Sequence, residues 1–387
     1  MNADVTEDVA QVRELVRKFV ANEMPRELAA QWDKENRFPR DVFNKLAALG
    51  LLGLTVPEAY GGLGRNIVGA MVVIEELSRR SLAVAIPYIN AACYAGMNIA
   101  EFGTQAQREE LLPKVVSGHM IFAYGWTEPD IGSDLAGVKT RAVRDAESFV
   151  VNGNKRFITG SNECDLIYTL VRTGPEVARH RNLTLLMIPP HSPGVTITPI
   201  DGLGLKGFAT TDVRFENVRV PVSNVLGGEA RIDDAWSMIA GVGLDVEKLE
   251  VAAMAVGIAQ AAFDDAWAYS LDRRQFGKPI AEYQSIRHKL ADMRTQLHAA
   301  RLMLYDAAAL CDQQRPCAAE TSMVKLFATE ACKAIALECQ TIFGAYGYVK
   351  GFDVERYVRD ALGLPIIGGS SAIQRNNIYK STLRSLQ

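Results

Sequence analysis

Alanine-rich helical segments fill the C-terminal part of this 387-residue chain and limit what it can fold into. The three longest run over Val246–Ser270, Ile280–Asp312 and Cys317–Phe343. Long helices of this composition bury their apolar faces by packing on one another, so they predict a helical bundle. A chain of this length has room for two or three domains, each with a core of its own.

The first 118 residues carry a helical pattern as well. From Asp8 to Met24, apolar residues recur at helical spacing, namely Val9, Val12, Val16, Phe19 and Val20. A second helix is predicted from Pro39 through Leu49, with Gly50 as its stop. More alanine-rich helices follow to about residue 118.

Between these helical parts, residues 122–225 alternate in polarity and contain turn dipeptides, which favours a small β-domain. The segment Ser148–Ile158 reads as two strands joined by a hairpin turn at Asn152-Gly153. Further strands are expected at Leu183–Ile188 and Val213–Val220. The predicted fold class is α+β, mainly α: an N-terminal helical domain (1–120), a central small β-barrel or sandwich domain (121–228) and a C-terminal helical bundle (229–387).

The charge balance argues against polyanionic partners. With 42 basic and 45 acidic residues the net charge is −3, so neither nucleic acid nor an anionic membrane surface is expected to bind. No apolar stretch is expected to reach the roughly 20 residues of a membrane helix. The acidic N-terminus lacks the apolar core of a secretory signal and does not resemble a transit peptide.

The six cysteines contain no Cys-x-x-Cys pair, and four lie in helical segments where buried free thiols are common. A reduced, cytoplasmic setting is therefore expected. The five histidines show no metal-ligand spacing, so no metal site is predicted.

A glycine motif at Gly202–Gly207 fits the G-x-G-x-x-G pattern of dinucleotide-binding proteins. That fingerprint needs a helix directly after the glycines, because the helix N-terminus holds the pyrophosphate. Here the strand-like segment Thr211–Val220 follows instead, so the motif is predicted to be an ordinary loop.

Three separated motifs carry a resemblance to a known family. The first is Tyr124-Gly-Trp-Thr-Glu-Pro-Asp-Ile-Gly-Ser-Asp134, and the second is Arg273-Arg-Gln-Phe-Gly-Lys-Pro-Ile280 followed by Tyr283-Gln284. The third runs from Thr341-Ile-Phe-Gly-Ala-Tyr-Gly347 through Val358-Arg-Asp360 to Gly368-Gly-Ser-Ser371. Their order and spacing resemble the acyl-CoA dehydrogenases over essentially the whole chain. The resemblance implies a C-terminal four-helix bundle, an FAD cofactor, an acyl-CoA substrate and a homotetramer.

The resemblance also implies roles for individual residues. Those expected to line the flavin ring are Tyr124, Trp126, Thr127, Phe157 and Thr159. Gly132 and Ser133 match contacts to the flavin phosphate and the thioester side. The segment expected to reach FAD in a neighbouring subunit comprises Arg273, Gln275 and Phe276, where the Arg fork suits phosphate oxygens. Further cofactor contacts are expected from Gln284, Thr341, Gly344 and Ser370.

A carboxylate base is required to remove a thioester α-proton. Many relatives carry Glu just before Gly-Thr-Ser in the third motif, but this chain has Gly368 there. The isovaleryl-CoA and long-chain types place the Glu on a bundle helix, and Glu247 occupies that position. Glu247 is therefore the expected base, and the Gly368 amide is expected to bind the thioester oxygen. Glu250, one turn away, is the competing base, and a site without a side-chain base is a further alternative.

Substrate contacts are expected from Ser133, Asp245, Lys248 and Gly369. Asp245 and Lys248 match positions near the CoA pantetheine or nucleotide, and Lys248 replaces a commoner Arg. Other departures from the family pattern are Phe157 for Trp, Ala345 for Gly, Thr341 for Gln and the apolar residues Pro365, Ile366 and Ile367. Taken singly, Trp126, Phe157 and Phe276 would be read as core aromatics, Arg273 as a solvated helix end and Glu247 as a solvated helix residue.

The resemblance implies α,β-desaturation of an acyl-CoA to a 2-enoyl-CoA, with electrons leaving to an electron-transfer flavoprotein. One alternative is the reverse reaction, an enoyl-CoA reductase. Others are a flavin-dependent lyase or oxidase acting on a CoA thioester without an α-proton base, and a protein that only binds flavin. Acyl chain length and the choice between CoA and an acyl carrier protein do not follow from the sequence.

Overall fold

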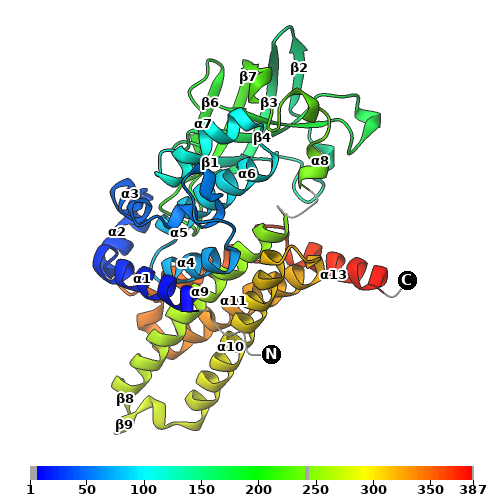
Figure 1. Cartoon of the computed structure of the whole chain (residues 1–387). Coiled ribbons are helices and arrows are strands. Elements are labelled where there is room, and N and C mark those ends of the chain that lie inside the picture. Colours follow the sequence, from blue (N-terminus) through cyan, green and yellow to red (C-terminus); the bar gives the residue numbers. More distant parts are fainter. Residues whose placement is uncertain (1–6, 240–243, 386–387) are drawn as a thin grey trace.

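The computed structural model describes residues 7–239 and 244–385 and places a sheet domain at one end of a long helical body (Figure 1). The described N-terminal part is helical. Its helices are α1 (Glu7–Glu23), α2 (Arg26–Glu35), α3 (Arg40–Ala48), α4 (Ile67–Ser78), α5 (Leu82–Tyr88), a π-helix (Ile89–Met97), α6 (Asn98–Phe102) and α7 (Gln105–Val116). Local sequence sets several ends: Pro25 and Pro39 precede α2 and α3, and Thr104 and Gln107 form a capping box on α7.

The central domain is one curled seven-stranded sheet with the order β1-β4-β2-β3-β7-β6, and β5 pairs with β4. Its strands are β1 (Phe122–Gly125), β2 (Arg141–Asp145), β3 (Ser148–Thr159), β4 (Leu166–Arg172), β5 (Leu183–Ile188), β6 (Val195–Pro199) and β7 (Thr210–Pro221). Strand β1 is the edge strand of the sheet and runs parallel to β4. It also contacts the π-helix, so the loop after β1 begins at the border between the sheet and the helices.

The C-terminal part is helical again. Its elements are α8 (Ala235–Met238), α9 (Leu244–Asp272), the short hairpin β8 (Arg274–Gln275) and β9 (Lys278–Pro279), α10 (Gln284–Asp312), α11 (Ala318–Phe343), α12 (Val354–Gly363) and α13 (Ser371–Ser385). Helices α9, α10 and α11 pack on one another, and α13 packs on α11. The predicted fold class, with a β-domain between two helical parts, is confirmed.

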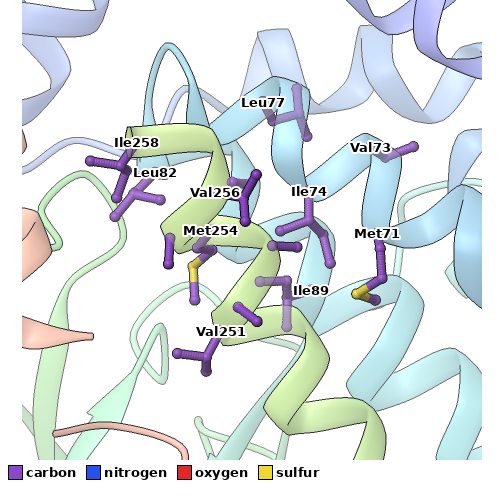
Figure 2. Packing of buried hydrophobic residues seen from close by; sticks show 14 of the residues in the cluster. Met71, Val73, Ile74, Leu77, Leu82, Ile89, Val251, Met254, Val256 and Ile258 are labelled. Atoms are coloured by element: carbon purple, nitrogen blue, oxygen red, sulfur yellow. The ribbon is translucent and has the colours of Figure 1, made fainter. Parts of the chain in front are cut away.

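Helix α9 also packs on α4, so the two helical parts share a core. Figure 2 shows Ile74 and Leu77 of α4 beside Val256 of α9, with Ile89 of the π-helix close by. This contact fixes the first half of α9 against the N-terminal helices, and Glu247 lies in that half.

The predicted hairpin at Asn152-Gly153 is wrong. Strand β3 runs unbroken from Ser148 to Thr159, and its register against β7 shifts between Val151 and Gly153, as in a β-bulge. The Asn152 side chain accepts a hydrogen bond from the Asn217 amide (2.8 Å), which holds the bulge across the ladder. The Gly202–Gly207 motif is a loop that leads into β7, as predicted.

The expectation that no apolar stretch reaches membrane-spanning length is also wrong. Residues Leu82–Phe102 form a 21-residue helical run that is long and apolar enough by length and composition. However, 89% of the apolar window is buried inside the protein, and core helices pass the same test. By its burial, the run is a core helix of the N-terminal part.

Gly257 allows the close crossing of α9 over α4. A Cβ at this position would lie 2.3 Å from the Glu75 carbonyl oxygen and 2.8 Å from the Ser78 Cβ. An unhindered Gly→Ala change inside a helix stabilises by about 1 kcal/mol, but overpacking a core costs roughly 1–3 kcal/mol. We predict that Gly257→Ala lowers the urea unfolding midpoint. A midpoint equal to or above that of the unchanged protein would contradict this packing.

Candidate active site

The loop after β1 is tied down by a buried ion pair. Glu128 accepts hydrogen bonds from the backbone amides of Lys139 (2.7 Å) and Thr140 (2.9 Å) and from the Lys155 ammonium (2.9 Å). Lys155, on β3, also donates to the Trp126 carbonyl (3.1 Å). Lys155 was not among the residues predicted from the sequence. The only signal for it there is a charged residue inside a strand-like run.

Aromatic rings stack behind this loop. The Tyr124 ring lies 3.6 Å from the Tyr94 ring and 4.4 Å from the Trp126 ring, measured between centroids. Asn98 donates to the Tyr124 hydroxyl (2.5 Å), which fixes that ring. The indole N–H of Trp126 is buried and has no hydrogen-bond partner in the described chain. A buried donor without an acceptor is costly, so this group is suited to an acceptor atom on a bound ligand.

Phe157 and Thr159 lie where β3 meets the helices. Phe157 has a positive φ of 61° at a second irregularity of β3 and is 57% exposed, so it is not a core aromatic. The Thr159 carbonyl accepts a hydrogen bond from Asn90 of the π-helix (3.3 Å). Gly132 and Ser133 are exposed on the loop, and open space surrounds the Cβ position of Gly132.

Two carboxyl groups of α9 enter the same region at different depths. Burial raises the pKa of Glu247 to about 7, although the positive charges of Lys248 and Lys325 oppose the rise. Glu250 is 2% exposed, and burial, followed by the charge of Glu247, raises its pKa well above the usual value. One oxygen of Glu250 has no hydrogen-bond partner in the described chain. The Cys93 thiol lies beside the same carboxyl group. Glu247 is therefore the group poised to exchange a proton near neutral pH, whereas burial and the charge of Glu247 favour the neutral form of Glu250.

Asp245 and Lys248 pair with each other at the start of α9. The Lys248 ammonium lies 2.8 Å from Asp245, which also accepts a hydrogen bond from Thr321 of α11 (3.1 Å). Because Lys248 forms an ion pair with Asp245, the positive charge that Lys248 presents to Glu247 is partly neutralised.

The Gly368–Gly369 turn faces the same helix. Both residues have positive φ values, 59° and 79°, and a Cβ at position 368 would lie 2.9 Å from Val251 Cγ2. The backbone therefore favours glycine at position 368. Gln374 donates to both carbonyls (3.0 Å each), whereas neither amide donates to a protein group in the described chain. Ser370 follows the turn, and its hydroxyl accepts from the Ile373 amide (3.4 Å).

The remaining predicted cofactor residues lie at the other end of the molecule. The hairpin β8–β9 projects from the far end of α9 (Figure 1), and Phe276 at its tip is 94% exposed. Thr341 and Gly344 lie near that end too, where Tyr269 of α9 stacks on Phe343 (4.0 Å). Arg273, Gln275 and Gln284 belong to the same region. Within one chain this group does not meet the β1 loop.

Comparisons with known proteins agree with this arrangement. Models of the acyl-CoA dehydrogenase N-terminal, middle and C-terminal domains match residues 6–119, 123–218 and 236–383. An acyl-CoA dehydrogenase of Bacillus subtilis is 38% identical over 98% of this chain and 99% of its own length. The caffeyl-CoA reductase-Etf complex subunit CarC of Acetobacterium woodii is 34% identical over 94% of this chain and 95% of its own.

A solved structure agrees as well. The butyryl-CoA dehydrogenase from Megasphaera elsdenii has a TM-score of 0.93 and 31% identity, covering 99% of this chain and 100% of that one. Fold and relatives together define an oxidoreductase that acts on CH–CH bonds. The chain belongs to the acyl-CoA dehydrogenase family, which is a family of flavoproteins.

We predict that Lys155→Met destabilises the protein by on the order of 3–5 kcal/mol, because Glu128 is left as an unpaired buried charge. The double variant Glu128→Gln/Lys155→Met should lose less than the sum of the two single variants, as expected for groups in contact. Thermal unfolding of the four proteins measures both effects. Additive losses would show that the two side chains do not interact.

Proposed function

We propose that this protein is an FAD-dependent acyl-CoA dehydrogenase that forms a 2-enoyl-CoA by removing an α-proton and a β-hydride. The observation that carries the proposal is the position of Glu247: a carboxyl on α9 with a pKa of about 7, close enough to Lys325 and to Tyr124 of the aromatic stack to interact with them electrostatically. A carboxylate made more basic by burial is what abstraction of a weakly acidic α-proton requires.

The residues present fit a flavin. On the loop after β1, the buried indole N–H of Trp126, which has no partner in the described chain, offers a hydrogen-bond donor. The open space around Gly132 offers room for the ligand. Thr127 and Thr159 add hydroxyl groups, and Phe157 offers an exposed aromatic face. When bound, FAD supplies the acceptor for the β-hydride.

The other parts of the site belong to the protein. Glu247 takes the α-proton, and the free amide of Gly368 donates a hydrogen bond to the thioester oxygen as negative charge develops there. The packed rings of Tyr94, Tyr124 and Trp126 exclude water from the reacting groups. Asp245, Lys248, Ser133 and Gly369 are proposed to hold the CoA portion of the substrate.

A second candidate is the reverse reaction. A carboxyl with a pKa of about 7 is partly protonated at neutral pH, so Glu247 is equally suited to donate a proton to the α-carbon of an enoyl-CoA. The relative named caffeyl-CoA reductase-Etf complex subunit favours this direction. A base-free lyase or oxidase is less favoured, because it leaves Glu247 without a role.

The proposed partner for electrons is an electron-transfer flavoprotein, in keeping with the name of that relative. The proposed assembly is a homotetramer, because Arg273, Gln275 and Phe276 contact FAD only if another subunit's cofactor reaches them. All six cysteines are free and buried, which suits the proposed cytoplasmic location.

Glu247→Gln should slow reduction of the bound flavin by roughly 10²–10⁴-fold, the usual contribution of a general base. The measurement is anaerobic mixing with butyryl-, isovaleryl- and octanoyl-CoA, followed by flavin absorbance. Glu250→Gln should lose far less, because burial favours the neutral form of Glu250, which does not accept a proton. In the unchanged protein the rate should rise with pH through about 7, as Glu247 loses its proton.

A fully active Glu247→Gln protein would refute the assignment of the base. Failure of every saturated acyl-CoA to reduce the flavin, with oxidation of the reduced flavin by crotonyl-CoA, would favour the reductase. Turnover with oxygen as acceptor would favour an oxidase, and release of a leaving group without net reduction would favour a lyase.

A further inference from the structure

Lys325 of α11 is a buried lysine that pairs with no carboxylate among the residues the structure describes. Its side chain is 0% exposed, and its ammonium donates to the Gly369 carbonyl (2.8 Å). The other buried lysines, Lys155 and Lys248, each lie within 3 Å of a carboxylate. Within residues 7–239 and 244–385, Lys325 has no carboxylate inside 4 Å. A buried ammonium held only by a carbonyl is costly, so its presence calls for a function.

The surroundings of Lys325 place it between the proposed base and the glycine turn. A Cβ on Gly368 would lie 4.0 Å from Lys325 Cε. From α9, Glu247 acts on the lysine electrostatically, and Glu330 does so from α11 itself. Burial lowers the pKa of Lys325 to about 8, and these two carboxylates oppose the fall, so the ammonium form dominates at neutral pH.

The groups that face Glu247 are few. Lys248 is its neighbour on α9, and Glu250 lies one turn further on the same helix. The π-helix contributes Tyr94, β1 contributes Tyr124, and α11 contributes Lys325. Because Lys248 is paired with Asp245, Lys325 is the cation near Glu247 that no carboxylate in the described chain neutralises directly.

We propose that Lys325 is a positioning residue for the proposed α-proton transfer. It holds the Gly369 carbonyl inward, so that the amides of the Gly368–Gly369 turn face the thioester, and its charge favours the ionised form of Glu247. The inference rests on the proposed function. When the α-proton passes to a Glu247 oxygen, the negative charge moves from that carboxylate to the thioester oxygen. The ammonium of Lys325 neither gives nor takes a proton in this step.

The test uses the FAD-loaded full chain and compares Lys325→Met with Lys325→Arg. Flavin reduction is followed from about pH 6 to about pH 9 with whichever of the three saturated acyl-CoAs reduces the unchanged protein fastest. In Lys325→Met the midpoint of the pH profile should move upward by roughly one unit, because an opposite charge near the base is lost. Lys325→Arg keeps the charge and should restore most of the midpoint. Lys333→Met removes a half-buried cation of α11 that pairs with Glu330 instead of facing Glu247, and it should leave the midpoint unchanged.

A second readout does not depend on turnover. Acetoacetyl-CoA has an acidic α-carbon, and the fraction bound as its enolate, measured by absorbance at fixed pH, should fall in Lys325→Met and recover in Lys325→Arg. If the Met variant does not fold, Lys325→Gln serves instead, since it retains a donor for the Gly369 carbonyl and loses only the charge. It should show the same shift of the midpoint.

An equal loss of rate at every pH, with an unchanged midpoint and enolate fraction, would overturn the inference and leave Lys325 a purely structural residue. An unchanged protein that no saturated acyl-CoA reduces would contradict the proposed function instead. The two failures are therefore distinct.

Discussion

Two carboxyl groups one helical turn apart, Glu250 buried and Glu247 partly buried, impose the main constraint on this site. Glu247 and Glu250 cannot both be ionised cheaply, because each charge disfavours the other and burial disfavours both. The more deeply buried group, Glu250, lies beside the Cys93 thiol, and burial favours its neutral form. Glu247 has Lys248 and Lys325 nearby, so the proton exchange near neutral pH belongs to it.

This constraint works only because α9 is held on several sides. Its contact with α4 relies on a glycine at position 257, and its contact with the Gly368–Gly369 turn relies on a glycine at 368. A Glu at 368, on a backbone with positive φ, would meet Val251 of α9. The carboxylate and the turn therefore complement each other: the helix carries the acid, and the turn offers two amides that donate to no protein group in the described part of the chain.

Much of this organisation could be predicted from local sequence, because helix periodicity and the three motifs are local signals. The helices around Glu247 and the loop character of Gly202–Gly207 follow from such signals. The wrong prediction at Asn152-Gly153 has a long-range cause. Asn217 of β7 bonds to Asn152, and β3 forms a bulge against β7 there in place of the predicted hairpin turn.

The interactions that set charge at the site were not predictable in the same way. Lys155 and Lys325 act on groups 27 and 44 residues away, Glu128 and Gly369. In the sequence, Lys325 is a single lysine in an apolar segment, and Lys155 is one of two adjacent basic residues in a strand-like run. The surroundings of Glu247 and Glu250 likewise depend on the π-helix, which is distant in sequence and brings Tyr94 close to both carboxyl groups and Cys93 close to Glu250.

A crystal structure of the Glu247→Gln protein with FAD and butyryl-CoA would test the central claim most directly. The side chain of residue 247 should contact the α-carbon of the thioester, and the thioester oxygen should lie within hydrogen-bond distance of the Gly368 amide. A residue 247 turned away from the α-carbon, or a thioester oxygen bound elsewhere, would contradict it.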